Sequence, residues 1–350
     1  MLITGKDSTG QIDPAEIKKI LIIQFQPFGD VILSTTYLKA LSEKFPTAKI
    51  DFLVRKPYDQ VLFKNPYLNR VITEKTEKGI RQIISRIKLF LNIKSRKYDL
   101  IIDQQNNPGS GQAVLFSNAK YRLGWADADW KFTYNLRAPR GPVRYNGSRK
   151  FDILTPLGIT EQPYELFFHI KEESHLYIDQ WLANKKIPEG EFICISPGSP
   201  VWSKRWHEEG YAGLADLIIN NTDYNVILLW GPSEKDIVDE IARRMQNKPV
   251  TAPKTDFNQA GALISKSALF ICNDGGLNHL SVALKTPTLA IFGYTKTDVW
   301  SPASVFSDHH HLQSADKAPG PFDPSFGITP EAAFNRILDI IRIKSIEKSQ

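Results

Sequence analysis

The chain has 350 residues, of which 42% are hydrophobic and 23% charged, a composition typical of a globular protein with two domains. It has no run of 18 apolar residues and residues 1–14 are polar, so we expect neither a membrane-spanning helix nor an export signal. The two cysteines, Cys194 and Cys272, lie in apolar strand-like runs and are expected to be buried free thiols in a reducing compartment.

The net charge of +6 is unevenly distributed along the chain. Residues 1–165 carry 26 Lys and Arg against 16 Asp and Glu, which gives +10, whereas residues 166–350 carry 18 against 22, which gives −4. This asymmetry indicates that the first half meets an anionic partner, such as a phosphorylated lipid, a membrane surface or nucleic acid. The alternative is that the charge only serves solubility.

Apolar strands alternate with amphipathic helices through the first half. The apolar run 19–25 is typical of a buried parallel strand, and a turn then leads to Asp30. One helix is predicted to follow, with apolar positions to Phe45 and an end at Pro46, and further strands are predicted at 50–54 and 98–103. The helix between those strands has its apolar residues at Ile80, Ile83, Ile84, Ile87 and Leu91.

Two segments of the first half have more than one interpretation. The Lys and Arg residues of 78–97 fit either a membrane surface or, preferably, the outer face of a helix that covers the sheet. Residues 125–151 mix aromatic and basic side chains with Pro and Gly, so a long functional loop is expected there. Residues 161–173 are interpreted as the passage between domains, and a helix is expected at 174–185.

The second half repeats the alternation, so the chain is predicted to be α/β with mainly parallel sheets. Its strands are expected at 192–196, 225–230, 269–272 and 288–292, and each is followed by a loop of small or polar residues. Loops at the carboxyl ends of parallel strands lie side by side, so these segments should converge on one ligand site. Thr329, Pro330 and Glu331 open the last predicted helix.

The turn at 273–276 shows most clearly what this site would bind. Asn273, Asp274, Gly275 and Gly276 separate a strand from a helix, so free N–H groups at the helix start favour an anion. His279 lies on the first helical turn, within reach of the same anion. An ordinary turn of an α/β domain is the alternative.

Four segments together resemble glycosyltransferase family 9, the ADP-heptose:lipopolysaccharide heptosyltransferases. They occur in the family's order and lie between residues 19 and 302. The matching residues are Gly29-Asp30-Val31-Ile32-Leu33-Ser34-Thr35, Pro197-Gly198-Ser199 with Lys204-Arg205-Trp206, Gly231-Pro232-Ser233-Glu234, and Asp274-Gly275-Gly276-Leu277-Asn278-His279-Leu280 with Phe292-Gly293-Tyr294-Thr295.

The resemblance implies a GT-B architecture, in which two Rossmann-like domains face each other across a cleft. The implied division is an acceptor-binding domain at 1–165, a linker at 166–190, a nucleotide-sugar-binding domain at 191–325, and a C-terminal helix at 326–350 that crosses back to the first domain. The reaction implied is inverting and needs neither an essential metal nor another cofactor.

The resemblance also implies residue roles. Asp30 matches the general base and Lys204 the lysine that stabilises the leaving diphosphate. The donor-binding residues implied are Ser196, Gly198, Ser199, Gly231, Glu234, Thr255, Asp274, Gly275, Gly276 and His279. For an anionic acceptor we select Asn106, Arg137, Arg140, Arg144 and Arg149, most of them from the basic loop.

Each of these assignments has a structural alternative. Asp30 and Glu234 also fit acids favoured at a helix start, Lys204 a surface lysine, and His279 a core histidine. The chain departs from the family pattern at Gly275, where Thr or Ser is usual, and at His207, where Pro is common. The first departure removes one hydroxyl contact to phosphate.

Two further signals favour metals only weakly. Asp127-Ala128-Asp129 has the spacing of a metal-binding D-x-D motif, but its irregular surroundings favour a solvated loop. His309-His310-His311 is interpreted as a polar loop, because consecutive side chains cannot all face one ion.

The resemblance thus implies an inverting, metal-independent glycosyltransferase that moves heptose or a similar sugar from a nucleotide-diphosphate donor, ADP-heptose, to an anionic glycolipid acceptor of the lipopolysaccharide-core type. We expect it in the cytoplasm, with peripheral contact to the inner membrane and no nucleic-acid partner. The alternatives are a GT-B transferase or sugar-nucleotide epimerase that uses a UDP- or GDP-sugar, and a non-catalytic module that binds nucleotides or polyanions.

Overall fold

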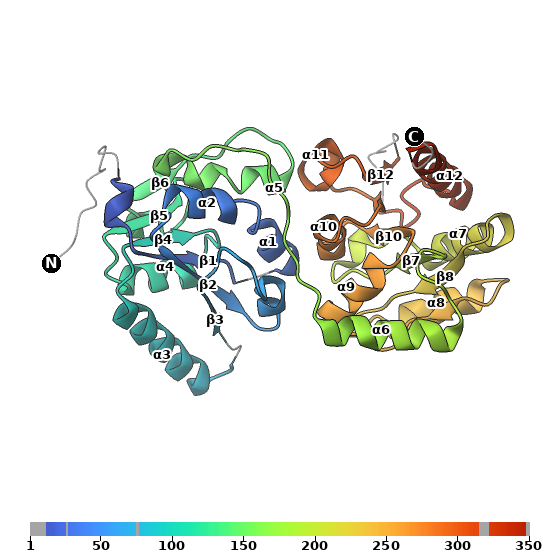
Figure 1. Cartoon of the computed structure of the whole chain (residues 1–350), viewed down its shortest axis with the longest axis horizontal. Helices are drawn as coiled ribbons and strands as arrows, with labels where there is room; N and C mark the ends of the chain where they lie inside the picture. Colours follow the sequence, from blue (N-terminus) through green and yellow to red (C-terminus); the bar gives the residue numbers. More distant parts are fainter. Residues whose placement is uncertain (1–11, 26, 75–76, 315–321, 348–350) are drawn as a thin grey trace. The chain divides into compact units, whose positions relative to one another are not determined.

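The computed structural model describes residues 12–25, 27–74, 77–314 and 322–347, with side chains to 342, and the chain divides into two units, Met1–His169 and Ile170–Gln350 (Figure 1). Gln26, in the predicted turn before Asp30, and most of the polar segment 1–14 lie outside the described residues. Each unit is built on one six-stranded sheet whose paired strands are all parallel. The α/β class expected from the sequence is confirmed.

The first unit has the strand order β3-β2-β1-β4-β5-β6. Its strands are β1 (Lys19–Ile23), β2 (Lys49–Arg55), β3 (Arg70–Glu74), β4 (Leu100–Asp103), β5 (Tyr121–Trp125) and β6 (Leu136–Ala138). Its helices are α1 (Phe28–Leu33), α2 (Leu38–Lys44), α3 (Ile80–Arg96), α4 (Pro108–Phe116) and α5 (Asn146–Arg149), with 3₁₀ turns at Pro14–Glu16, Tyr58–Leu62, Lys131–Thr133 and Asp152–Leu157. Figure 1 shows α2 and α4 on opposite faces of this sheet.

The second unit has the strand order β12-β11-β10-β7-β8-β9. Its strands are β7 (Phe192–Ser196), β8 (Asn225–Leu228), β9 (Val250–Thr251), β10 (Leu269–Asn273), β11 (Thr288–Phe292) and β12 (His309–Gln313). Its helices are α6 (Glu172–Lys185), α7 (Glu208–Asn221), α8 (Lys235–Arg244), α9 (Phe257–Ser265), α10 (Gly276–Ala283), α11 (Thr297–Trp300) and α12 (Pro330–Glu347), with 3₁₀ turns at Trp202–Lys204 and Pro302–Ser304.

The apolar runs form the cores, as their sequence indicates. β7, β10 and β11 are buried along their whole length, because helices cover both faces of a parallel sheet. In the second unit α7 packs between α8 and α12, and α6 packs against α9. Both cysteines are free and buried, and burial raises the pKa of each thiol.

The last helix begins as its cap residues predict. The hydroxyl of Thr329 accepts a hydrogen bond from the N–H of Ala332 at 3.2 Å, and α12 starts at Pro330. Phe334 and Ile337 of this helix join the core of the second unit. The expectation that the helix reaches back to the first half stays a prediction.

The structure corrects the expectation of one helix after Asp30. Two helices, α1 and α2, are separated by a turn at 34–37. The hydroxyls of Ser34, Thr35 and Thr36 donate to backbone carbonyls three or four residues earlier, at 2.7–2.9 Å. Such side-chain bonds compete with the helical pattern, and three of them in a row break it.

Two segments interpreted as loops contain strands. Residues 125–151 include the end of β5 together with β6 and α5, and the two strands complete the first sheet. The three histidines are the first residues of β12, which pairs with β11. The strands were missed because β6 has only three residues and β12 begins with three polar ones, so neither has the apolar run that identifies a buried strand.

The helix predicted between the strands at 50–54 and 98–103 is confirmed as α3, but the prediction of which side packs on the sheet is wrong. The residues expected to face the sheet are exposed, whereas Leu89 and Ile93 are buried and anchor the helix. Among the helices of the described residues, none is long and apolar enough to cross a membrane.

His309 makes the second unit sensitive to acid. Its ring is buried in β12 and burial lowers its pKa to about 4, whereas an unfolded chain protonates histidine near 6.5. Its contribution to the free energy of unfolding is therefore complete above pH 6.5 and is lost as the pH falls toward 4, by roughly 3 kcal/mol.

We expect His309→Leu, which cannot be protonated, to lose less stability than the wild type between about pH 7.5 and about pH 4.5. Urea denaturation at both pH values measures this, with His175→Leu on α6 as the matched histidine control. Equal losses in wild type and His309→Leu would contradict the assignment.

Candidate functional site

The predicted residues gather where strand order reverses in each sheet. The chain turns from one side of the sheet to the other between β1 and β4 in the first unit, and between β7 and β10 in the second. Ligands of doubly wound folds bind at such switch points, beyond the carboxyl ends of the strands. Asp30 follows β1 and Asn106 follows β4, while Lys204 follows β7 and Asp274 follows β10.

Asp30 lies in the first turn of α1 and is paired with a lysine that the sequence did not identify. Its Oδ1 is 2.9 Å from Nζ of Lys150, and the side chains are 24% and 8% exposed, respectively. Lys150 also donates to Oε1 of Gln24 at 3.2 Å. Lys150 was missed by one residue, because the neighbouring Arg149 was selected from the sequence.

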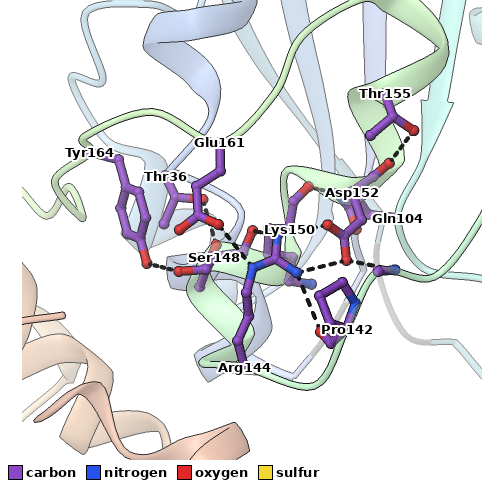
Figure 2. Close-up of polar contacts among 12 residues, drawn as sticks. Thr36, Gln104, Pro142, Arg144, Ser148, Lys150, Asp152, Thr155, Glu161 and Tyr164 are labelled. Carbon is purple, nitrogen blue, oxygen red and sulfur yellow. Dashed lines mark hydrogen bonds and ion pairs between the residues drawn. The ribbon is translucent and has the colours of Figure 1, made fainter. Parts of the chain in front are cut away.

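Amide side chains connect the loops around this pair. Oε1 of Gln105 accepts from the N–H of Phe25 at 2.7 Å and from Nε2 of Gln24 at 3.0 Å. Nε2 of Gln104 donates to the carbonyl of Lys150 at 3.1 Å, a contact drawn in Figure 2. The ends of β1 and β4 and the segment after α5 are thus connected next to Asp30.

Asn106 lies in a loop organised by a buried acid. Asp103 accepts hydrogen bonds from the hydroxyl of Tyr134 at 2.7 Å and from the N–H groups of Gln105 at 3.0 Å and Asn106 at 3.3 Å. Burial raises the pKa of Asp103 to about 6. Asn106 has the left-handed backbone angle φ 53°, which its short polar side chain tolerates.

Arg144 and Arg140 have internal partners. The guanidinium of Arg144 donates to Asp152 at 2.7 Å, to Glu161 at 2.9 Å and to the carbonyl of Ser148 at 3.1 Å (Figure 2). Arg140 pairs with Asp127, the first acid of the D-x-D sequence, at 3.1 Å. These contacts give both arginines a structural role.

The other two selected arginines have fewer such contacts. Arg137 is exposed on the edge strand β6. Nε of Arg149, at the end of α5, is buried without a hydrogen-bond partner among the described residues. Binding of an acceptor by any of the four arginines stays a prediction, and the geometry favours these two.

In the second unit the central contact joins Lys204 to Asp274. Nζ of Lys204 is 2.7 Å from Oδ2 of Asp274, and the side chains are 25% and 2% exposed. The ammonium also lies 5.4 Å from the ring centre of Trp300. The carboxylate of Asp274 therefore fixes the lysine. The backbone N–H of Asp274 donates to the carbonyl of Ile291 at 3.2 Å, so Asp274 offers no hydrogen-bond donor to an anion.

Glu234 connects two of the predicted loops. It occupies the N-cap position of α8, but its side chain turns to the preceding loop, where its Oε2 accepts from the N–H of Gly231 at 2.8 Å. A Cβ atom at Gly198 would lie 2.1 Å from the carboxyl carbon of Glu234, so a larger residue there would displace this carboxylate. The carboxylate therefore lies over the loops that follow β7 and β8.

Asn273, which the sequence identified only as a turn residue, holds the loop after β7. Its Nδ2 donates to the carbonyl of Pro197 at 2.7 Å, and its Oδ1 accepts from Tyr211 at 2.9 Å and from the N–H of Trp206 at 3.0 Å. The sequence around Asn273 does not indicate this role, because the partners of its side-chain amide are far away along the chain. Ser196 and Ser199 are buried in the same region.

The start of α10 has the expected form. Gly275 is its N-cap in an extended conformation, and a Cβ there would find its nearest atom 3.9 Å away. Thus sterics do not require glycine at this departure from the family pattern. Gly276 opens the helix, and His279 is buried with its ring 6.3 Å from that of Trp300. Thr255 lies partly buried between β9 and α9.

Comparisons with known proteins agree with this arrangement. A sequence model of glycosyltransferase family 9 (heptosyltransferase) matches residues 86–319. Lipopolysaccharide heptosyltransferase 3 of Escherichia coli K12 is 28% identical over 285 residues, which cover 78% of this chain and 82% of the relative.

Two solved structures have the same fold. The glycosyl transferase family 9 protein of Veillonella parvula DSM 2008 superposes with a TM-score of 0.81 at 20% identity, over 92% of this chain and 97% of its own. The ADP-heptose lps heptosyltransferase II of E. coli gives 0.77 at 22% identity, over 93% and 99%.

The pair of Lys204 and Asp274 predicts a clear stability pattern. Lys204→Met leaves the buried carboxylate unpaired and should lower the free energy of unfolding by about 2 kcal/mol, because an uncompensated buried charge is costly. The double variant Lys204→Met with Asp274→Asn should recover most of this loss. Urea denaturation measures both, and a double variant no more stable than Lys204→Met would show that the two side chains are not coupled.

Proposed function

Because the chain belongs to glycosyltransferase family 9 and is a glycosyltransferase of GT-B architecture, we propose that it transfers heptose from ADP-heptose to an anionic saccharide of the lipopolysaccharide core. The donor and the acceptor are those named by its relatives, a lipopolysaccharide heptosyltransferase and an ADP-heptose heptosyltransferase. In this proposal the first unit binds the acceptor and the second unit binds the donor.

The observation that carries the proposal is the ammonium of Lys204 beside the N-terminus of α10. Asp274 fixes this cation at the switch point of the second sheet, and the helix start adds backbone N–H groups. Together they suit a diphosphate that gains charge as it leaves. The proposed reaction therefore needs no divalent metal.

The remaining donor contacts follow from the loops at this edge. Glu234 accepts from the ribose hydroxyls, and Thr255 lies against the base. Ser196, Ser199, Gly231 and His279 line the same region. Gly198 has a different task, because it leaves room for the carboxylate of Glu234.

Asp30 is proposed to be the general base. It takes the proton of the acceptor hydroxyl while the hydroxyl oxygen attacks the anomeric carbon and the bond from that carbon to the diphosphate breaks. A single displacement of this kind inverts the anomeric carbon. Lys150 pairs with one oxygen of the carboxylate and so holds it in one orientation.

The acceptor is proposed to contact Asn106 after β4, Arg149 beside Lys150, and Arg137 on the edge strand β6. The charge of +10 on residues 1–165 favours an anionic acceptor such as phosphorylated lipopolysaccharide core. Such an acceptor is built on a lipid, so we place the protein in the cytoplasm, with peripheral contact to the inner membrane.

Replacing the proposed base tests the reaction. Asp30→Asn keeps the shape of the side chain but removes its basicity, so transfer should fall by at least about 100-fold. Product formation from ADP-heptose and a core acceptor measures this in the presence of EDTA. The affinity for ADP should stay within about twofold of the wild type. Unchanged turnover would remove Asp30 from the mechanism.

A pair of glycine variants tests the donor site. Gly198→Ala displaces Glu234 and should weaken ADP binding about tenfold, because a charged hydrogen bond to the ribose is lost. The Cβ of Gly275→Ala makes only an ordinary contact, at 3.9 Å, and this variant is the matched control. Calorimetric titrations with ADP, UDP and GDP measure both. Equal affinities of the two variants would contradict the role of Glu234, and tighter binding of UDP or GDP would contradict the donor.

A further inference from the structure

Helix α3 exposes an apolar stripe to solvent. Ile80, Ile83, Ile84, Ile87 and Leu91 are 48–74% exposed. Their spacing of three and four residues places all five on one side of the helix. Exposed leucines and isoleucines are unremarkable singly, but a contiguous row of five indicates a surface that binds something.

The helix is attached to the first unit by its other side. Leu89 and Ile93 are buried, and the main neighbour of α3 is α4. The ring of Phe90 stacks on that of Phe116 in α4 at 5.3 Å. Figure 1 shows α3 beside α4 at the margin of the first unit. The stripe therefore faces away from the core that holds the helix.

Cations accompany the stripe and acids do not. The helix contains five basic residues and no Asp or Glu. The basic residues are Arg81, Arg86, Lys88, Lys94 and Arg96. Arg81 and Lys88 are exposed and lie on one flank of the stripe by their helical positions, and the exposed Lys94 continues the stripe at its C-terminal end. Apolar residues bordered by exposed cations are the pattern of a helix that lies in the interface of an anionic bilayer.

More positive charge lies at the C-terminal end of the helix. A cavity of about 220 Å³ there is lined by Arg96 of α3 together with Lys19, Lys49 and Arg70. Its single acid, Asp51, lies 4.0 Å from Arg96 and accepts hydrogen bonds from Tyr98 and Asn69 at 2.7 Å, so the lining keeps an excess of positive charge. These cations strengthen the attraction of this end of the unit to negative lipid headgroups.

We infer that α3 docks the protein on the surface of a bilayer that contains anionic lipids, with its apolar stripe inserted among the headgroups. The positive charge of α3 favours an anionic bilayer over a second copy of the chain as the binding partner. A symmetric dimer through α3 would bring two sets of five cations together without any acid of the helix to compensate them. An anionic membrane compensates them and covers the apolar stripe as well.

The inference deepens the proposed function, because a lipid-linked acceptor would lie in the same membrane, but its evidence is independent of the transferase site. Co-sedimentation with vesicles of phosphatidylcholine and phosphatidylglycerol tests it. Ile83→Ser with Ile87→Ser should weaken vesicle binding by at least about tenfold, because two inserted side chains are lost. Leu176→Ser, an exposed leucine of α6, is the matched control and should bind as the wild type.

The cations give a second readout. Arg81→Gln with Lys88→Gln should weaken binding and reduce its dependence on salt, and vesicles of phosphatidylcholine alone should bind weakly. Vesicle binding unaffected by the isoleucine changes would overturn the proposal. So would a wild-type dimer, seen by light scattering, that these changes dissociate while vesicles bind neither form.

Activity separates this proposal from the transferase proposal. With a lipid-free core saccharide as acceptor, the isoleucine double variant should transfer heptose at the wild-type rate. With an acceptor anchored in anionic vesicles, its rate should fall in parallel with vesicle binding. If the wild type transfers heptose to neither acceptor, the proposed function is contradicted and docking is judged by vesicle binding alone. If the wild type and the isoleucine double variant have equal rates on the vesicle-anchored acceptor, docking through α3 is overturned.

Discussion

The ion pair between Lys204 and Asp274 is the contact on which the second unit's site depends. It exists because β7 and β10 are neighbours in the sheet although their first residues are 77 positions apart in the chain. Both strands are fully buried, so their carboxyl ends are fixed by the core. Asn273, one residue before Asp274, holds the carbonyl of Pro197 and thereby the loop that carries the lysine.

The first unit uses the same arrangement with the charges exchanged. In each pair the side chain proposed to act on substrate is the more exposed member, and its partner is buried: Lys150 holds Asp30, and Asp274 holds Lys204. A buried partner loses little further freedom when substrate arrives, so the acting group is already oriented. Both pairs lie at the carboxyl edge of a parallel sheet, where the order of strands reverses.

The sequence was sufficient for those features that depend on local pattern. Continuous apolar runs identified β1, β7 and β11, and the polar residues after them identified the edge of the sheet where the candidate site residues gather. The cap residues around Thr329 placed the start of α12. Binding motifs at the ends of strands were informative because a parallel sheet converts their positions in the chain into proximity in space.

Features that depend on long-range packing were not predictable. Lys150, whose partner is 120 residues away, has no motif, and Arg144 was selected for its charge although internal acids already engage it. Periodicity showed that α3 is amphipathic but not which side meets the protein, because the helix has apolar residues on opposite faces. The polar edge strand β12 gave no strand signal at all.

The two thiols offer an intrinsic probe of local opening in the second unit. Cys194 and Cys272 lie on the adjacent strands β7 and β10, and alkylation requires a thiolate that buried sulfur does not form. Reagent can reach them only when the segments that cover the faces of this sheet open locally, so the rate of modification reports the opening of the scaffold that holds Lys204 and Asp274. Occupation of that scaffold by a nucleotide would then be visible as slower labelling, without any dye or engineered reporter.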